Sequence, residues 1–201
     1  MSPDYSFIKR VFDIVLSLFT LVCLIPFFIL ISLFIKISDR GPIFFIQNRV
    51  GRNAKLFKMV KFRTMNINHN GSSVSVKGES RIKAPWGIVF RKYKIDELPE
   101  LWNILMGEMS FVGPRPDVPG YADQLKGNDR QLLSVRPGLT CPASIKYSNE
   151  EELLALQTDP QKYNDEILYP DKVRMNLAYI KQQSFWFDIK IIVYTFLAKK
   201  L

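Results

Sequence analysis

Residues 11–37 read VFDIVLSLFTLVCLIPFFILISLFIKI, an almost uninterrupted apolar run. The run exceeds the roughly 20 residues that an α-helix needs to cross the hydrocarbon core of a bilayer. A cleaved signal peptide would have a shorter apolar stretch and a small-residue cleavage site, and the sequence that follows lacks the paired cysteines of an exported domain. We therefore expect a membrane segment that stays on the mature protein.

The centre and the flanks of this run argue against a straight spanning helix. Pro26 removes a backbone donor and clashes with the preceding turn, so the helix should kink there. Basic residues flank both ends, namely Lys9, Arg10, Lys36, Arg40, Arg49 and Arg52. The positive-inside rule then gives no orientation, and both ends look cytoplasmic. A hairpin that enters one leaflet and returns satisfies both observations, while a kinked spanning anchor stays open because membrane helices tolerate proline.

Asp13 lies inside the apolar run, where a charge is costly unless it is paired. Lys9 and Arg10 precede it by about one helical turn, so we expect one of them to be its partner. A position of Asp13 at headgroup depth is the alternative.

The composition excludes several mechanisms. The 201 residues contain 28 Lys and Arg against 19 Asp and Glu, which gives a net charge of +9, but only two cysteines and one histidine, His69. A zinc site, a disulfide framework and histidine-based nucleophilic catalysis are therefore disfavoured, and a metal would need oxygen ligands. The charge requires an acidic partner, which can be nucleic acid, a membrane surface or a phosphorylated substrate.

After Ser38 the pattern predicts an α/β domain that is mainly helical, so we divide the chain into a membrane segment at 1–38 and a soluble domain at 39–201. We expect strands at 43–46 and 56–63, a loop at 66–79, and helices at 86–93, 98–105, 150–156 and 171–183. The aromatics and lysines of 185–200 favour an amphipathic helix in the headgroup plane, with a core-packed terminal helix as the alternative.

The segment RKYKIDELPELWNIL, residues 91–105, carries the strongest chemical signal. Pro99 is acceptable only in a first turn, so a helix should begin near Ile95 or Asp96. Asp96 and Glu97 are adjacent, cannot share one helix face, and can therefore have separate tasks. This arrangement suits an aspartate nucleophile that attacks phosphorus beside a glutamate that binds a divalent cation. Acidic residues in a first turn can also serve only to complement the helix dipole.

Basic residues that suit phosphate occur around this pair. Lys61 and Arg63 lie on a predicted strand, and Arg91 precedes Asp96 by little more than a turn. Arg115 stands between two prolines and Arg136 stands before one, so each has a stiff backbone that favours bidentate capture of phosphate. Taken singly, either arginine could instead form a structural turn with a salt bridge.

Four segments in order resemble the bacterial sugar transferase family, the monotopic phosphoglycosyltransferases. They are FKMVKFRTM at 57–65, DELPELWN at 96–103, MSFVGPRP at 109–116 and VRPGLT at 135–140. The resemblance runs from the apolar N-terminal segment to the C-terminal helix, and the length is similar to that of the small, minimal-domain members.

The resemblance implies a re-entrant membrane helix broken at Pro26 and a small cytosolic α/β catalytic domain with interfacial helices, monotopic on the cytoplasmic face of the bacterial inner membrane. It also implies a Mg²⁺-dependent reaction in which Asp96 attacks the β-phosphorus of a UDP-sugar, releases UMP and passes the phosphosugar to polyprenyl phosphate. Glu97 would coordinate Mg²⁺, with Asp96 as a second ligand. The expected phosphate-binding residues are Lys61, Arg91 and Arg115, with Arg63 and Arg136 as further candidates.

The charge then divides between two acidic partners, membrane lipid and substrate phosphate. The residues expected at lipid headgroups are Lys9, Arg10, Lys36, Arg40, Lys199 and Lys200. Nucleic acid is not an expected partner, because the basic residues form neither a helical stripe nor an aromatic platform. A non-catalytic membrane adaptor that binds anionic lipid is the alternative function, and later glycosyltransferases of a glycan pathway are candidate partners of the enzyme.

The sequence departs from the family pattern in two places. Many members continue with Gly-Trp and Gln-Val-x-Gly-Arg after the Arg-Pro-Gly-x-Thr motif, whereas residues 141–152 read CPASIKYSNEEE. The nucleotide and sugar contacts of that region are therefore expected to differ. Ile25 precedes Pro26 where a serine is frequent, so no side-chain hydroxyl can bond the carbonyl that Pro26 leaves free.

Overall fold

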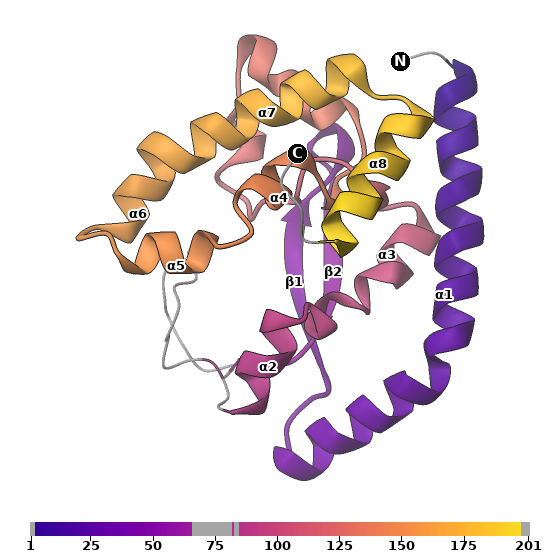
Figure 1. Ribbon diagram of the computed structural model, residues 1–201. Helices are drawn as coiled ribbons and strands as arrows, with labels where there is room; N and C mark the ends of the chain where they lie inside the picture. Colours follow the sequence, from indigo (N-terminus) through magenta and orange to yellow (C-terminus); the bar gives the residue numbers. More distant parts are fainter. Residues whose placement is uncertain (1–2, 66–81, 83–84, 198–201) are drawn as a thin grey trace.

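The computed structural model describes residues 3–65, 82 and 85–197. It is mainly helical, with two small sheets and one long apolar helix, α1, along one side (Figure 1). The regular elements are α1 Pro3–Ser38, β1 Phe44–Val50, β2 Leu56–Phe62, α2 Trp86–Lys92, α3 Glu100–Met106, β3 Ser110–Val112, β4 Gly138–Thr140, α4 Pro142–Lys146, α5 Glu150–Ala155, α6 Pro160–Tyr163, α7 Tyr169–Gln182 and α8 Phe185–Phe196. The loop predicted at 66–79, His69, Lys199 and Lys200 lie outside the described residues.

Shorter helical turns complete the order of elements. They are η1 Arg52–Ala54, η2 Ile95–Glu97, η3 Ala122–Gln124, η4 Gly127–Ser134 and the π-helical turn η5 Asn164–Leu168. The predicted strands and helices are present with shifted ends, because β1 continues to Val50 and α7 already begins at Tyr169.

The apolar run forms a helix that continues through Pro26. At 1.5 Å per residue its 36 residues span about 54 Å. Figure 1 shows that α1 changes direction in its C-terminal half, the half that contains Pro26. The break expected at Pro26 is thus a bend inside one helix, as a proline that removes one backbone donor produces.

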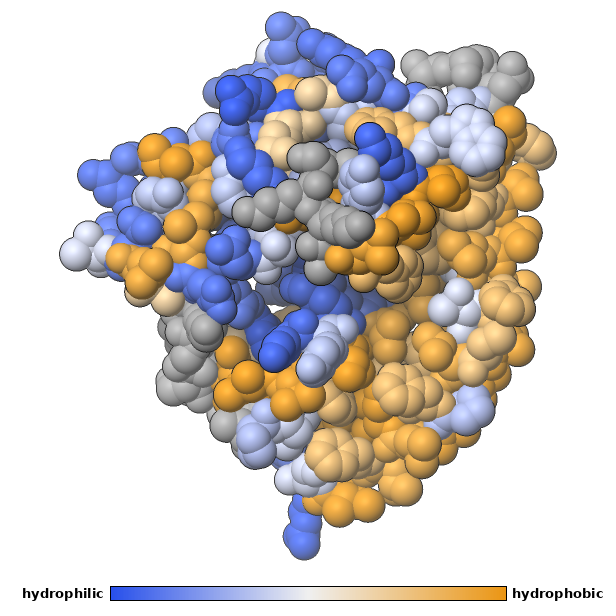
Figure 2. Space-filling model, viewed as in Figure 1, coloured by the Kyte–Doolittle hydropathy of each residue, from blue (hydrophilic) through white to orange (hydrophobic). Residues whose placement is uncertain are grey.

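Both ends of α1 contact the rest of the protein. Near the N-terminus, Arg10 donates hydrogen bonds to the carbonyl oxygens of Ile104 and Leu105, at 2.7 and 2.8 Å. Near the other end, Ile35 is fully buried in a cluster that includes Phe62 of β2. The outer face of α1 stays exposed and apolar, which Figure 2 shows as a continuous hydrophobic surface.

Asp13 forms no ion pair with Lys9 or Arg10 among the described residues, although both act on it electrostatically. Asp13 is buried and accepts hydrogen bonds from the Ser110 hydroxyl and the Phe111 amide, each at 3.1 Å. Lys9 instead forms an ion pair with Asp188 of α8. The reason is tertiary: β3 presents a hydroxyl and an amide directly to Asp13, whereas the longer side chains of Lys9 and Arg10 reach α8 and α3.

Two small sheets position the segments that carry the motifs. β1 and β2 are antiparallel, with Phe44 opposite Phe62 and Val50 opposite Leu56. β3 and β4 are parallel and bring the segments around the two Arg-Pro motifs side by side. A Cβ atom at Gly138 would lie 2.1 Å from the backbone nitrogen of Gly113, so this close approach requires glycine.

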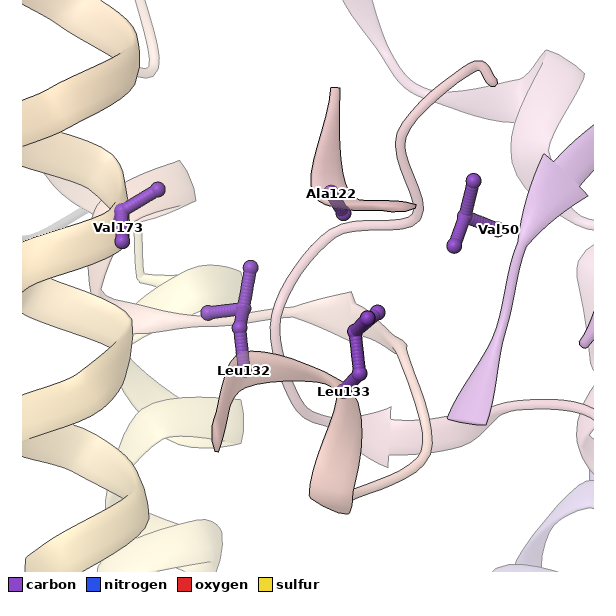
Figure 3. Packing of buried hydrophobic residues seen from close by; sticks show 5 residues of the cluster. All are labelled: Val50, Ala122, Leu132, Leu133 and Val173. Carbon is purple, nitrogen blue, oxygen red and sulfur yellow. The ribbon is translucent and has the colours of Figure 1, made fainter. Parts of the chain in front are cut away.

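The apolar core joins these sheets to the helices. One cluster packs the end of β1 against η3, η4 and α7 through Val50, Ala122, Leu132, Leu133 and Val173 (Figure 3). A second cluster packs β2 against α3 through Phe57, Met59, Leu101, Ile104 and Met109. Fully burying an aliphatic or aromatic side chain contributes about 1.5–3 kcal/mol, so these clusters fix β2 and α3 relative to each other.

The last helix, α8, packs on the core with one side and is exposed on the other, so its position at a membrane interface stays a prediction. Asp188 and Ile191 of α8 are buried against the core, as in a packed terminal helix. Trp186 and Phe196 are 79% and 86% exposed, so the other side of α8 presents large apolar groups outward.

Candidate functional site

Asp96 and Glu97 lie on the short connection between α2 and α3. Lys94 has a left-handed backbone, with φ of 56°, and the 3-10 turn η2 follows it. A helical turn therefore begins at Ile95 as expected, but α3 itself begins only at Glu100. The amides of Glu97 and Leu98 already donate to the carbonyls of Lys94 and Ile95. Those two amides are therefore not available to a ligand.

Glu97 is held by two cations from distant parts of the chain. Lys61 of β2 donates to Oε1 at 2.9 Å, and Arg115 forms a two-point ion pair with both carboxylate oxygens. Burial alone would raise the pKa of Glu97, but Arg115 and Lys61 outweigh burial and hold it well below its ordinary value. Glu97 is therefore an ionised carboxylate at any physiological pH.

Lys61 connects two carboxylates. Its ammonium group lies 2.9 Å from Glu97 and 3.1 Å from Glu100, and the side chain of Glu100 is 2% exposed. Burial would lower the pKa of Lys61, but the two glutamates raise it, so the lysine stays protonated. The buried Glu97 and Glu100, together with Lys61 and the partly exposed Arg115, thus form a network of balanced charge.

Asp96 differs from its neighbour. Its Oδ1 is buried and has no hydrogen-bond partner within the part of the chain that the structure describes. Burial raises the pKa of Asp96 to about 6, Lys61 partly opposes this, and the charge of Glu97 adds to it. A carboxylate with few hydrogen bonds and a raised pKa is a better base and nucleophile than an ordinary one. The two adjacent acids therefore have different surroundings, and the pKa of Asp96 is raised where that of Glu97 is lowered.

The other basic residues have different surroundings. Arg91 forms an ion pair with Glu151 of α5 and donates a weak hydrogen bond to the Met65 sulfur at 3.5 Å. The segment that departs from the family pattern therefore contacts one of the expected phosphate-binding residues. Arg91 also interacts electrostatically with Asp96, which places it beside the acidic pair.

Arg63 and Arg136 make structural contacts. Arg63 is 3% exposed and binds the turn after α1, through an ion pair with Asp39 at 3.0 Å and a hydrogen bond to the Pro42 carbonyl. Arg136 donates to the Gly107 carbonyl at 2.8 Å, beside the carbonyls that Arg10 binds at the end of α3. Among the contacts that the structure describes, neither arginine touches Asp96 or Glu97.

Three residues near the site were missed as site residues. Glu100 follows the acidic pair by one turn, Arg49 lies near the end of β1, and Asp117 follows the Arg115 motif. The sequence gave a signal for Glu100, which lies inside the DELPELWN segment, and for Asp117, which directly follows MSFVGPRP. Arg49 gave none, because it reaches the site through the pairing of β1 with β2. Burial raises the pKa of Asp117 to about 6, although the Tyr169 hydroxyl donates to it at 3.1 Å and opposes the shift.

A hydrophilic hollow opens in the middle of the face shown in Figure 2, and apolar side chains border it toward α1. The side chain of Arg115 is 42% exposed, so it can contact a solute while it holds Glu97. The site thus combines buried carboxylates, an accessible guanidinium and an adjacent apolar surface.

The donor set fits a magnesium ion only in part. No group of three or more potential metal ligands occurs among the residues that the structure describes. The Asp96 Oδ1 atom without a partner lies next to the ionised Glu97, and Mg²⁺ is frequently held by one or two carboxylates together with substrate phosphates. These two residues therefore fit a cation that arrives with a phosphorylated substrate.

Comparisons with known proteins show the family of this chain. Residues 4–199 match the protein family described as bacterial sugar transferase. An Aeromonas hydrophila UDP-N-acetylgalactosamine-undecaprenyl-phosphate N-acetylgalactosaminephosphotransferase is 33% identical over 96% of this chain and 44% of its own length. An Escherichia coli UDP-glucose:undecaprenyl-phosphate glucose-1-phosphate transferase is 34% identical over 94% of this chain and 39% of its own length.

A shorter relative matches over most of its length. The exopolysaccharide production protein ExoY of Sinorhizobium fredii is 32% identical over 93% of this chain and 83% of its own length. The chain thus spans less than half of the first two relatives and most of the third. Because the family match covers nearly every residue, this protein belongs to the bacterial sugar transferase family.

Proposed function

We propose that the protein is a phosphoglycosyltransferase that moves a phosphosugar from a UDP-sugar to undecaprenyl phosphate and releases UMP. The observation that carries the proposal is the buried Asp96 Oδ1 atom without a partner, beside a Glu97 that Lys61 and Arg115 hold ionised. The names of the two transferase relatives support the substrate classes. The reaction would start a surface polysaccharide or glycoprotein glycan, and later glycosyltransferases would use its product.

The reaction proceeds in two displacements. Asp96 Oδ1 forms a bond to the β-phosphorus, the bond from that phosphorus to the bridging oxygen breaks, and UMP leaves with that oxygen. A phosphate oxygen of undecaprenyl phosphate then attacks the same phosphorus, and the Asp96 carboxylate leaves unchanged. Positioning and charge stabilisation supply most of the catalysis of phosphoryl transfer, and Lys61 and Arg115 are the cations beside the acidic pair.

Glu97 and Asp96 are the residues that would hold Mg²⁺. When bound, the ion would neutralise phosphate charge and act as a Lewis acid. Glu97 suits this task because its pKa is held well below the ordinary value, so it stays a carboxylate ligand. Lys61 and Arg115 keep the side chain of Glu97 in one orientation.

The packing of α1 supports a re-entrant, monotopic arrangement on the cytoplasmic face of the bacterial inner membrane. Arg10 near one end and Ile35 near the other both contact the same body of the protein. A straight span would place these two ends on opposite sides of the bilayer, and the body cannot contact both there. Exposed apolar residues of α2, α3 and α8, such as Ile88, Trp102 and Trp186, suit contact with the same interface.

The test is release of UMP by the purified protein in detergent, with Mg²⁺, undecaprenyl phosphate and a panel of UDP-sugars. We expect release with at least one donor, a phosphosugar adduct on the intact chain when undecaprenyl phosphate is omitted, and loss of both with Asp96→Asn. Substantial turnover by Asp96→Asn would remove Asp96 as the nucleophile. Salt-sensitive liposome binding without UMP release from any donor would favour the lipid-binding adaptor.

Removal of the metal tests the cofactor separately. EDTA should abolish UMP release, and Mg²⁺ in excess should restore it. Glu97→Gln keeps the size of the side chain but loses its charge, so it should require a higher Mg²⁺ concentration for half-maximal activity. Full activity in EDTA would contradict the magnesium proposal and leave the aspartate mechanism intact.

A further inference from the structure

Arg49 is a partly buried cation without an ion pair among the described residues. It lies near the end of β1, where its Nη1 donates to the carbonyl of Pro116 at 3.1 Å and its Nη2 donates to the side chain of Gln47 at 2.7 Å. Its Nε is buried and has no hydrogen-bond partner in the described part of the chain. Within the same residues, no carboxylate lies within ion-pair distance of it.

This arrangement is unfavourable for the protein alone. A guanidinium has five N–H donors, and the structure gives Arg49 two neutral acceptors. Burial and the nearby positive charge of Arg115 together lower the pKa of Arg49 to about 10, although the charges of Asp117, Glu100 and Glu97 oppose this shift. A buried charge that lacks a partner destabilises a fold. Departures from favourable packing of this kind are expected at functional sites.

The contacts of Arg49 place it beside the phosphate-binding side of the site. Its acceptor, Pro116, directly follows Arg115, and the neighbouring Val50 amide donates to the carbonyl of Asp117 at 2.9 Å. The end of β1 is therefore bound to the segment that carries Arg115. Glu97 and Glu100 also act electrostatically on Arg49. Arg49 and Arg115 are thus two guanidiniums on joined segments, and only Arg115 has a carboxylate partner.

Two neighbouring guanidiniums, of which only one has an ion pair, suit a ligand with two negative phosphate groups. Guanidinium groups bind phosphate oxygens bidentately, and such charge-assisted hydrogen bonds are the strong ones. Among the described contacts, only two of the N–H donors of Arg49 have an acceptor, so the guanidinium keeps donor capacity for a phosphate. We propose that Arg49 binds a phosphate group of the diphosphate of the sugar nucleotide, next to Arg115. This inference rests on the proposed function for the identity of the substrate, but diphosphate binding can be measured without turnover.

The test uses inorganic pyrophosphate as the probe. Its affinity for the full-length protein in detergent is measured by calorimetry, and its inhibition of UMP release is measured in parallel. Arg49→Gln should weaken pyrophosphate binding about tenfold or more and raise the KM for the UDP-sugar by a similar factor, with a smaller change in kcat. Arg49→Lys keeps the charge but loses the planar fork, so it should recover only part of the affinity.

Arg130→Gln is the matched control. Arg130 is an exposed arginine of η4, and its one described hydrogen bond is weak. Thermal unfolding of each variant separates binding from folding. The inference would be overturned if folded Arg49→Gln bound pyrophosphate with an affinity within twofold of wild type. If Arg49→Gln does not fold, the same result with Arg49→Lys would overturn it. Wild-type protein that binds pyrophosphate with the help of Arg49 but releases no UMP from any donor would refute the proposed function instead.

Discussion

At the scale of single residues, the site depends on how two adjacent carboxylates are surrounded. Asp96 and Glu97 have similar chemistry, yet the pKa of one is raised and that of the other is lowered. The sequence predicted the pair and the cations Lys61 and Arg115. It did not predict which acid they would hold, because strand pairing and the close approach of β3 and β4 decide this.

The two-point ion pair between Arg115 and Glu97 leads to a first prediction. Arg115→Lys keeps the charge but cannot bind both oxygens of Glu97 in one plane. The kcat/KM for UMP release should therefore fall about 10- to 100-fold, which corresponds to about 1.4–3 kcal/mol of transition-state stabilisation. Arg130→Lys, on the exposed η4, should leave kcat/KM unchanged. Equal rates for the two variants would mean that only the charge of Arg115 matters.

Asp117 leads to a second prediction, on the pH dependence of stability. Its pKa of about 6 in the folded protein exceeds the ordinary value of 3.8, so the folded state binds its proton more tightly than the unfolded state does. Below about pH 4 the protonated Asp117 contributes fully to the free energy of unfolding. This contribution is lost as the pH rises through 6. Asp117→Asn mimics the neutral acid and should raise the free energy of unfolding by about 3 kcal/mol at pH 7.5.

The comparison of wild type with Asp117→Asn across pH checks this linkage. The difference in Tm between the two proteins should be largest above pH 7 and should disappear near pH 4. A difference that is the same at both pH values would show that the asparagine acts through packing rather than through the proton.

At the scale of elements, the sequence predicted the types of most helices and strands, because apolar periodicity and proline positions are local signals. Contacts between elements were predicted less well. Asp13 was assigned a partner one helical turn away, but its partners lie on β3, about 100 positions along the chain. Arg63 was assigned to phosphate, but it holds the turn at Asp39. Local spacing cannot identify partners that only the folded chain brings near.

Asp188 of α8 shows how one buried group joins elements. Lys9 forms an ion pair with it, and the hydroxyls of Tyr5 and Tyr179 donate to it at 2.7 and 2.6 Å, so it connects α1, α7 and α8. Asp188→Ala should lower the free energy of unfolding by about 3–5 kcal/mol, because it leaves Lys9 buried without a partner.

Chemical denaturation in detergent measures this third prediction. Asp165→Ala is the control, because Asp165 is exposed although three side chains donate hydrogen bonds to it. It should cost less than about 1 kcal/mol. A cost for Asp188→Ala that does not exceed that of Asp165→Ala would mean that α8 is held mainly by its apolar contacts.

At the scale of the whole molecule, some of the basic residues behind the net charge of +9 have other partners than expected. Lys9 and Arg10 were expected at lipid headgroups, but they bind Asp188 and the end of α3. These contacts keep the first half of α1 against the protein body, and Ile31 and Ile35 do the same for the second half. Lys36 and Arg40 are exposed, so the expectation at lipid headgroups stays a prediction for these two residues, beside the exposed apolar surface that Figure 2 shows along α1.

This arrangement predicts that both ends of α1 face the same side of the membrane. In a Cys23→Ser background, which retains only the buried Cys141, single cysteines at Phe7 and at Arg40 would report the two ends. A membrane-impermeant maleimide should label both positions in inside-out vesicles and neither in spheroplasts. Lys162→Cys, on the exposed α6, marks the side of the soluble body. If Phe7→Cys and Arg40→Cys were labelled from opposite sides, α1 would span the bilayer, and its contacts at one end with the body would have to be broken in the membrane.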